Sequence, residues 1–82
     1  MRLRKAVRVF AQDMERKLLA NDHKPNKYQG MGNLWLIMRL RQETGELTRA
    51  LAAGKNVPDE AADVANFAMF ISDNFKRKAS GK

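Results

Sequence analysis

The sequence contains no cysteine, one histidine and two prolines among its 82 residues. Without cysteine, no disulfide can supplement a small hydrophobic core, and the lack of thiols is compatible with a reducing compartment. No apolar run reaches the roughly 20 residues that a membrane span requires, and residues 1–5 lack the apolar core of a secretory signal. We therefore expect a soluble, cytoplasmic protein with no membrane partner.

Acidic residues are also scarce, with nine Asp and Glu against 16 Lys and Arg, so that the formal net charge is +7. A positive field of this kind attracts polyanions, which include both nucleic acids and nucleoside triphosphates. The basic residues are spread along the chain, and no helix-turn-helix, zinc-finger or basic-zipper pattern organises them. The charge fits both classes of ligand and does not decide between them, and we expect no specific nucleic-acid partner.

The length of the chain predicts a single domain over residues 1–82. A domain this short has difficulty burying enough apolar surface to be stable alone. We therefore expect association into a homodimer or homotetramer. The basic residues at the end of the chain, about 76–82, are expected to form a frayed tail.

The first regular segment is predicted over residues 3–20. Apolar residues recur there at helical spacing and define one face of an amphipathic helix: Leu3, Val7, Phe10, Met14 and Leu18. Residues 23–32 are polar and contain Pro25 and two glycines, which predicts a loop. Long ordered loops often carry function.

A second helix is predicted over residues 33–53, with Asn33 as its N-cap and Gly54 after its last turn. Its apolar stripe steps by three or four residues through Leu36, Leu40, Glu43, Leu47 and Leu51. Gly45 lies inside this helix, where it either permits a close approach by another group or is a tolerated defect.

A third helix is predicted to run to about Phe75 or slightly beyond, with Asn56 as its cap and Pro58 in the first turn, where a missing N–H is harmless. The sequence therefore predicts an all-α fold. Each subunit would have three helices, with the second and third packed antiparallel, and oligomerisation would complete a helical bundle.

Four of the nine acidic residues form two pairs at i, i+3 spacing, Glu43 with Glu46 and Glu60 with Asp63. At this spacing, two side chains share one side of a helix. Such pairs are common on solvated helix faces, but Glu43 occupies a position in a leucine stripe, and Glu60 and Asp63 lead into Phe67 at the same spacing. Buried carboxylates that face one another need a cation between them. Oxygen ligands without His or Cys indicate Mg²⁺ or Mn²⁺ rather than zinc.

These two motifs, Glu43-x-x-Glu46 and Glu60-x-x-Asp63 followed by residues 64–69, resemble the metal-binding signature of the MazG-like nucleotide pyrophosphohydrolases, an all-α group. The frame around the first motif, Arg39-Leu40 and Leu47, is also similar, as is the upstream segment 21–24. The resemblance covers about residues 10–73. Family members often continue with a Gly-Gly-Trp-like turn where this chain has residues 25–28, Pro-Asn-Lys-Tyr.

The resemblance implies hydrolysis of a nucleoside triphosphate to its monophosphate and pyrophosphate, with Mg²⁺ or Mn²⁺ held by all four carboxylates. The metal would neutralise phosphate oxygens and make a bound water more acidic, and either Glu43 or Glu46 would act as general base. The candidate substrate-binding residues are Asn66 near the metal or nucleotide, Lys24, Lys27 and Arg39 for phosphates, and Trp35, which either stacks on a base or belongs to the core.

A second function remains open at this stage. A small basic helical protein that binds nucleic acid or regulates a partner would keep the same carboxylates as a structural metal site. Pyrophosphate release from a panel of nucleoside triphosphates separates the two functions.

Overall fold

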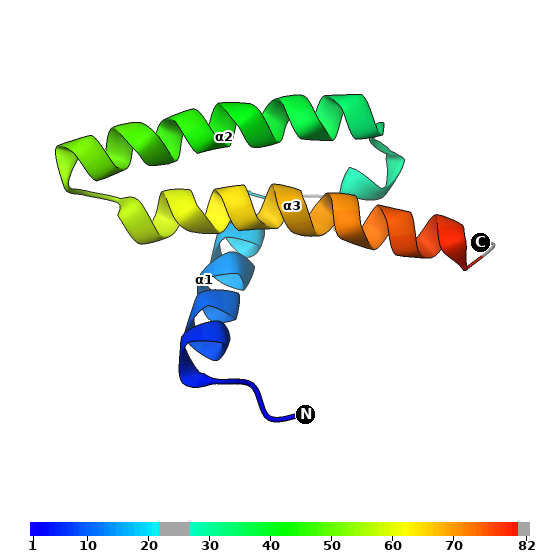
Figure 1. The fold of residues 1–82 in the computed structure, drawn as a ribbon, viewed down its shortest axis with the longest axis horizontal. Coiled ribbons are helices and arrows are strands. Elements are labelled where there is room, and N and C mark those ends of the chain that lie inside the picture. The colour runs from blue at the N-terminus through cyan, green and yellow to red at the C-terminus, as the bar shows by residue number, and fades with distance from the viewer. Residues whose placement is uncertain (22–26, 81–82) are drawn as a thin grey trace.

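The computed structural model describes residues 1–21 and 27–80 (Figure 1). These residues form three α-helices, α1 (Lys5–Asn21), α2 (Asn33–Ala53) and α3 (Val57–Ala79), together with a short 3₁₀ helix, η1 (Lys27–Gly30), and no strand. The prediction of an all-α fold with three helices is confirmed for this part of the chain. Among the described helices, none combines the length and the apolar character that a transmembrane span needs.

The ends of two helices differ from the sequence prediction. α2 begins at Asn33 itself, with Gly32 in the capping position, so the predicted N-cap is displaced by one residue. α3 continues past Phe75 to Ala79, and residues 76–79 are helical rather than frayed. The three basic residues of its last turn favour this extension, because positive charge stabilises the carbonyl end of a helix.

α2 and α3 lie side by side and share the most extensive packing in the described chain (Figure 1). Leu36 on α2 and Ala62 on α3 are completely buried between the elements, and Ala50 is nearly so. Leu51, the last member of the predicted stripe, is 62% exposed. Four helical turns span about 14.4 residues, so position 50 lies closer than position 51 to the side of the helix that carries Leu36.

The turn between α2 and α3 depends on two residues in the left-handed region. Gly54 has φ +73° and follows the last turn of α2, as predicted. Asn56 has φ +63° and stands before the first residue of α3, although its side chain makes no capping hydrogen bond. Its carbonyl oxygen instead accepts the N–H of Glu60 at 3.0 Å. This turn therefore sets the position of Glu60, in the first turn of α3, relative to α2.

η1 is attached to α3 through Tyr28. The Tyr28 ring stacks on Phe70 with centroids 4.2 Å apart, and its hydroxyl donates to an Asp73 carboxylate oxygen at 2.6 Å. The buried amide of Asn74 donates to the Tyr28 carbonyl oxygen at 3.0 Å. Part of the predicted loop is therefore an ordered turn held against α3.

α1 packs on α3 through its C-terminal half and leaves its N-terminal half extended away from the other helices (Figure 1). Arg16 pairs with Asp59 on α3 at 2.8 Å. Leu3 and Val7, which belong to the predicted apolar face of α1, are 40% and 45% exposed. The described chain therefore leaves part of the apolar face of α1 uncovered.

Candidate metal centre

Three carboxylates converge where α2 and α3 face each other. Glu43 from α2 and Glu60 and Asp63 from α3 each offer an oxygen, and these oxygens lie within 4.8 Å of one another. All three side chains are half-buried. The spacing of i, i+3 on α3 and the stripe position on α2 thus bring together three of the four predicted ligands.

Glu43 experiences the strongest electrostatic perturbation in this group. Burial raises the pKa of Glu43 above its ordinary value, and the neighbouring Asp63 carboxylate raises it further. Arg39, one turn earlier on α2, opposes the effect through an ion pair of 3.2 Å with the Glu43 carboxylate. The Glu43 side chain is only 13% exposed. A carboxylate in this environment favours a bound cation or a proton.

Glu46, the fourth predicted ligand, lies outside this group in the described chain. Its side chain is 50% exposed and pairs with Arg49 at 2.9 Å. Three residues along an α-helix correspond to a rotation of about 60° from the starting side chain. When Glu43 points at α3, Glu46 therefore points toward solvent beside it.

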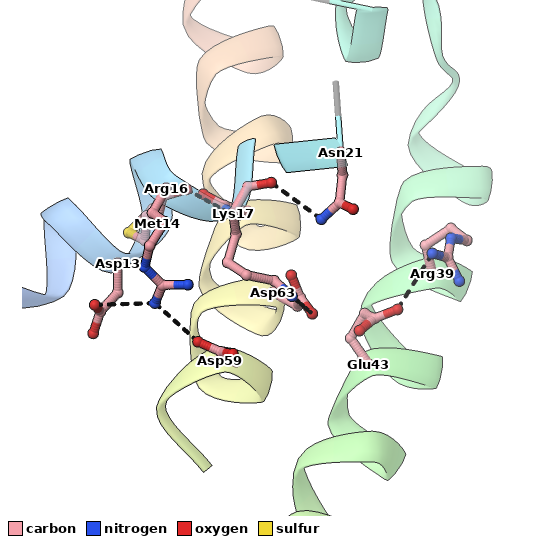
Figure 2. Close-up of polar contacts among 10 residues, drawn as sticks. Asp13, Met14, Arg16, Lys17, Asn21, Arg39, Glu43, Asp59 and Asp63 are labelled. Atoms are coloured by element: carbon pink, nitrogen blue, oxygen red, sulfur yellow. Dashed lines mark hydrogen bonds and ion pairs between the residues drawn. The ribbon is translucent and has the colours of Figure 1, made fainter. Parts of the chain in front are cut away.

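Asp63 has a basic partner on α1. Lys17 Nζ lies 3.4 Å from an Asp63 carboxylate oxygen, with both side chains largely shielded from solvent. Figure 2 shows Lys17 on α1, Asp63 on α3, and the Arg39–Glu43 pair on α2. Two of the three clustered carboxylates, Asp63 and Glu43, thus each form an ion pair with a basic residue of the same chain.

A cavity of about 600 Å³ opens beside the carboxylates and is lined by residues of α1, α2 and α3, together with η1. Its lining combines acidic, basic and aromatic side chains: Glu43, Asp63, Lys17, Lys27, Arg39, Tyr28, Trp35, Phe67 and Phe70, with Asn66. A volume of this size is typical of small-molecule sites. Cations and ring surfaces next to carboxylates suit a ligand with a phosphate end and a planar end.

The aromatic part of the cavity is built around Phe67. The Trp35 ring meets Phe67 edge-on with centroids 6.4 Å apart, and the guanidinium of Arg39 lies 5.0 Å from the Phe67 ring centre. Trp35 is 45% exposed, so it lines the cavity and is not a buried core residue. Its position is compatible with stacking against a planar ligand.

Asn66, which lines the same cavity, has a buried side-chain oxygen. The residue is 4% exposed, and its side-chain N–H donates to the carbonyl oxygen of Met14 on α1 at 3.1 Å. Among the described residues, its Oδ1 has no hydrogen-bond partner. A buried acceptor without a partner costs free energy. This oxygen is suited to accept a hydrogen bond from a bound ligand or from a water held by one.

The donor set fits a hard divalent cation. Carboxylate oxygens from two helices, with an amide oxygen one turn further along α3, are the ligands that Mg²⁺ and Mn²⁺ prefer. Among the described residues, no histidine or cysteine belongs to the group, whereas zinc sites usually contain them. The unpartnered Asn66 oxygen gives an independent reason to expect a ligand at this place.

The remaining predicted residues are distributed as follows. Lys27 and Arg39 line the cavity, as expected for phosphate contacts, and Lys24 lies outside the described residues. Several cavity residues were not predicted as site residues, among them Lys17 and Tyr28. Lys17 stands three residues after Met14 in the stripe of α1, so its helical position gave a signal, whereas nothing local indicated that Tyr28 would stack on α3.

Comparisons with known proteins identify no relative. No family model matches the chain, and no curated protein or solved structure matches it. The proposals below therefore depend on the residues and geometry of the site.

Proposed function

We propose that the protein is a divalent-metal-dependent nucleoside triphosphate pyrophosphohydrolase of the MazG-like kind. The observation that carries this proposal is the position of the three-carboxylate group of Glu43, Glu60 and Asp63, at the edge of a cavity that also contains cations and aromatic rings. A carboxylate cluster alone would fit many proteins. A carboxylate cluster next to basic and aromatic side chains favours a nucleotide substrate.

In this proposal, Glu43, Glu60 and Asp63 hold Mg²⁺ or Mn²⁺, and Glu46 joins them by rotating from its exposed pair with Arg49. Exposed pairs of this type contribute little, about 0.3–0.5 kcal/mol, so the contact does not prevent the rotation. The metal supplies charge neutralisation for the phosphate oxygens and a more acidic water. The Asn66 oxygen accepts a hydrogen bond from the bound nucleotide or from ordered water.

The protein's own groups would orient the substrate and move the proton. Lys27 and Arg39 contact the phosphates, Lys24 is a further candidate, and Trp35 stacks on the base. Glu43 or Glu46 would act as general base through an ordered water. In-line attack at the α-phosphorus by water then breaks the bond to the β-phosphate, with the monophosphate and pyrophosphate as products.

We further propose that the active protein is a cytoplasmic homodimer or homotetramer in which α2 and α3 form an antiparallel pair within a larger bundle. The uncovered apolar residues support association, since few side chains are fully buried in the described chain. Nucleic acid is not a specific partner in this proposal.

The test is an assay of pyrophosphate release from a panel of ribo- and deoxyribonucleoside triphosphates with Mg²⁺. We expect release from at least one member, no release in chelator, and none from D63N with an unchanged helical spectrum. Release of orthophosphate alone would contradict cleavage at the α–β bond. Metal binding without any hydrolysis across the panel would favour a structural metal site instead.

A further inference from the structure

Lys17 is a basic residue of the cavity that has no role in the proposed hydrolysis. It projects from α1, whereas the carboxylates and Arg39 come from α2 and α3 (Figure 2). Its Nζ lies 3.4 Å from Asp63, one of the three clustered carboxylates, and its side chain is 21% exposed. Lys17 therefore occupies the α1 side of the same cavity that Arg39 occupies from α2.

The ion pairs of Lys17 and Arg39 partly neutralise the carboxylate group. Glu43, Glu60 and Asp63 carry at most three negative charges, and the two basic residues place two positive charges against Asp63 and Glu43. A divalent cation that entered this group would meet the ammonium of Lys17 at close range. Like charges at such distances repel strongly in a partly buried site.

We propose that Lys17 is a ligand-exchange residue, which pairs with Asp63 in the free protein and transfers to a phosphate of the bound substrate when a divalent metal occupies the carboxylates. The inference rests on the proposed metal-dependent function and adds a phosphate-binding residue on α1 to it. A polyphosphate is the ligand class that satisfies both changes, because its oxygens bind the metal and accept the released ammonium.

Two consequences follow from this exchange. Metal alone binds weakly, since Lys17 loses its partner without gaining another. Metal and polyphosphate bind cooperatively, and the coupling is reciprocal, because each ligand must raise the affinity for the other by the same factor. A lysine that merely tethered α1 to α3 would produce neither effect.

The experiment measures two affinities in the full-length protein: that of Mn²⁺ alone, from the free Mn²⁺ signal in electron paramagnetic resonance, and that of inorganic pyrophosphate by calorimetry at a fixed free Mg²⁺ concentration. In K17M, which keeps most of the side-chain length without its charge, Mn²⁺ should bind more tightly and pyrophosphate more weakly. We expect each change to be at least about fivefold, the lower end of the usual range for coupled sites. K17R keeps the charge and should restore both values toward wild type.

Arg16 offers a matched control. It lies next to Lys17 and also forms an ion pair from α1 to α3, with Asp59 at 2.8 Å, but it is more exposed and does not line the cavity. R16M should therefore leave both affinities within about twofold of wild type, as surface charge changes away from a site do. Equal effects of R16M and K17M would overturn the exchange and show that α1 docking alone matters.

A measurement on the wild type tests the inference without any variant. The side-chain methylene resonances of Lys17 should shift when Mg²⁺ saturates the protein, and shift again when pyrophosphate is added. Resonances that stay unchanged at saturating Mg²⁺ would overturn the inference. If wild type binds Mn²⁺ and K17M has wild-type affinities for both ligands, this inference alone is overturned. If wild type binds no Mn²⁺ even with pyrophosphate present, the proposed function is overturned with it.

Discussion

The side chain of Asn66 on α3 donates a hydrogen bond to the main-chain carbonyl oxygen of Met14 on α1 at 3.1 Å. This contact joins the two helices beside the cavity and orients the rest of the amide group. Because the N–H is committed to Met14, the amide oxygen remains as an acceptor, and among the described residues no group donates to it. Asn66 thus holds α1 against α3 and also carries an acceptor oxygen without a partner beside the cavity.

This double role predicts how substitution of Asn66 affects stability. N66A removes a hydrogen bond whose net contribution is about 1 kcal/mol, and it leaves the Met14 carbonyl without that donor. In chelator, loss of the unpartnered oxygen offsets part of the cost. With Mg²⁺ and pyrophosphate bound, the oxygen has a partner, so we expect N66A to be destabilised more than in chelator.

Thermal unfolding of N66A and wild type under the two conditions provides the measurement. N74A is a useful comparison, since Asn74 is also buried on α3 and also donates to a main-chain carbonyl oxygen, but it does not line the main cavity. Its destabilisation should be the same with and without ligands. An N66A variant that behaved like N74A would assign Asn66 a structural role only.

Glu60 and Glu46 should differ in their contribution to metal binding. Glu60 belongs to the converging carboxylates, whereas Glu46 is half-exposed and paired with Arg49. We expect E60Q to lower the affinity for Mn²⁺ roughly tenfold or more. Even residues that only orient a metal ligand change metal affinity by about 10–100-fold. E46Q should weaken it by much less, although it still reduces turnover if Glu46 rotates into the site.

Mn²⁺ titrations of both variants, monitored together with their helical spectra, check this order. Asp59 lies next to Glu60 but pairs with Arg16 rather than joining the cluster, so D59N is the matched control and should bind Mn²⁺ as wild type does. If E46Q lost as much affinity as E60Q, Glu46 would contribute to metal binding as strongly as Glu60, and its side chain would leave Arg49 as soon as the metal binds.

The limits of the sequence prediction can be understood from these residues. The apolar periodicity predicted three helices, and the position of Glu43 in a leucine stripe predicted that this carboxylate faces α3. Local spacing could not decide whether Glu46 does so too, since a rotation of about 60° separates the two side chains. That outcome depends on how α2 and α3 are turned toward each other.

The part of the site contributed by α1 was less predictable still. The Asn66–Met14 bond and the Lys17–Asp63 pair join residues that are 52 and 46 positions apart, and the crossing of α1 over α3 determines both. Helical periodicity identifies the face of α1 that packs, but not the place on α3 where it packs. The stacking of Tyr28 on Phe70 is likewise a tertiary contact without a local signal.

Self-association is expected from the amount of apolar surface that the described chain leaves exposed. Only Leu36, Ala50 and Ala62 form its buried apolar core, while Phe75 and Leu34 are 72% and 74% exposed. A chain of this length rarely buries enough surface to be stable alone. We expect light scattering at micromolar concentration to give the mass of a dimer or tetramer.

Dilution distinguishes this association from incidental aggregation. If the active protein is the oligomer, specific activity and helical content should fall together as the measured mass approaches that of one chain. A folded monomer that retained full specific activity at nanomolar concentration would contradict the prediction.

The last prediction concerns Glu43 and the pH dependence of stability. Because burial and the Asp63 carboxylate raise its pKa in the folded state, folded protein holds the Glu43 proton to higher pH than unfolded protein does. As pH rises from the unfolded pKa through the folded one, ionised Glu43 therefore lowers the free energy of unfolding. E43Q removes this charge while nearly keeping the shape of the side chain. In chelator, E43Q should melt at or above the wild-type temperature near neutral pH, and this advantage should disappear below the unfolded pKa.

Added metal should reverse that order. An ion that binds only the folded state adds about 2.7 kcal/mol at a hundredfold excess over its Kd, and each kcal/mol raises the melting temperature of a domain this size by roughly 4–8 °C. Wild type should gain this increase with Mg²⁺ or Mn²⁺, whereas E43Q, which has lost a ligand, should gain much less. Melting curves of both proteins, in chelator and in metal at pH 4 and pH 7.5, measure these differences. If E43Q were less stable than wild type in chelator at pH 7.5 and metal changed neither protein, Glu43 would be a structural residue stabilised by its pair with Arg39.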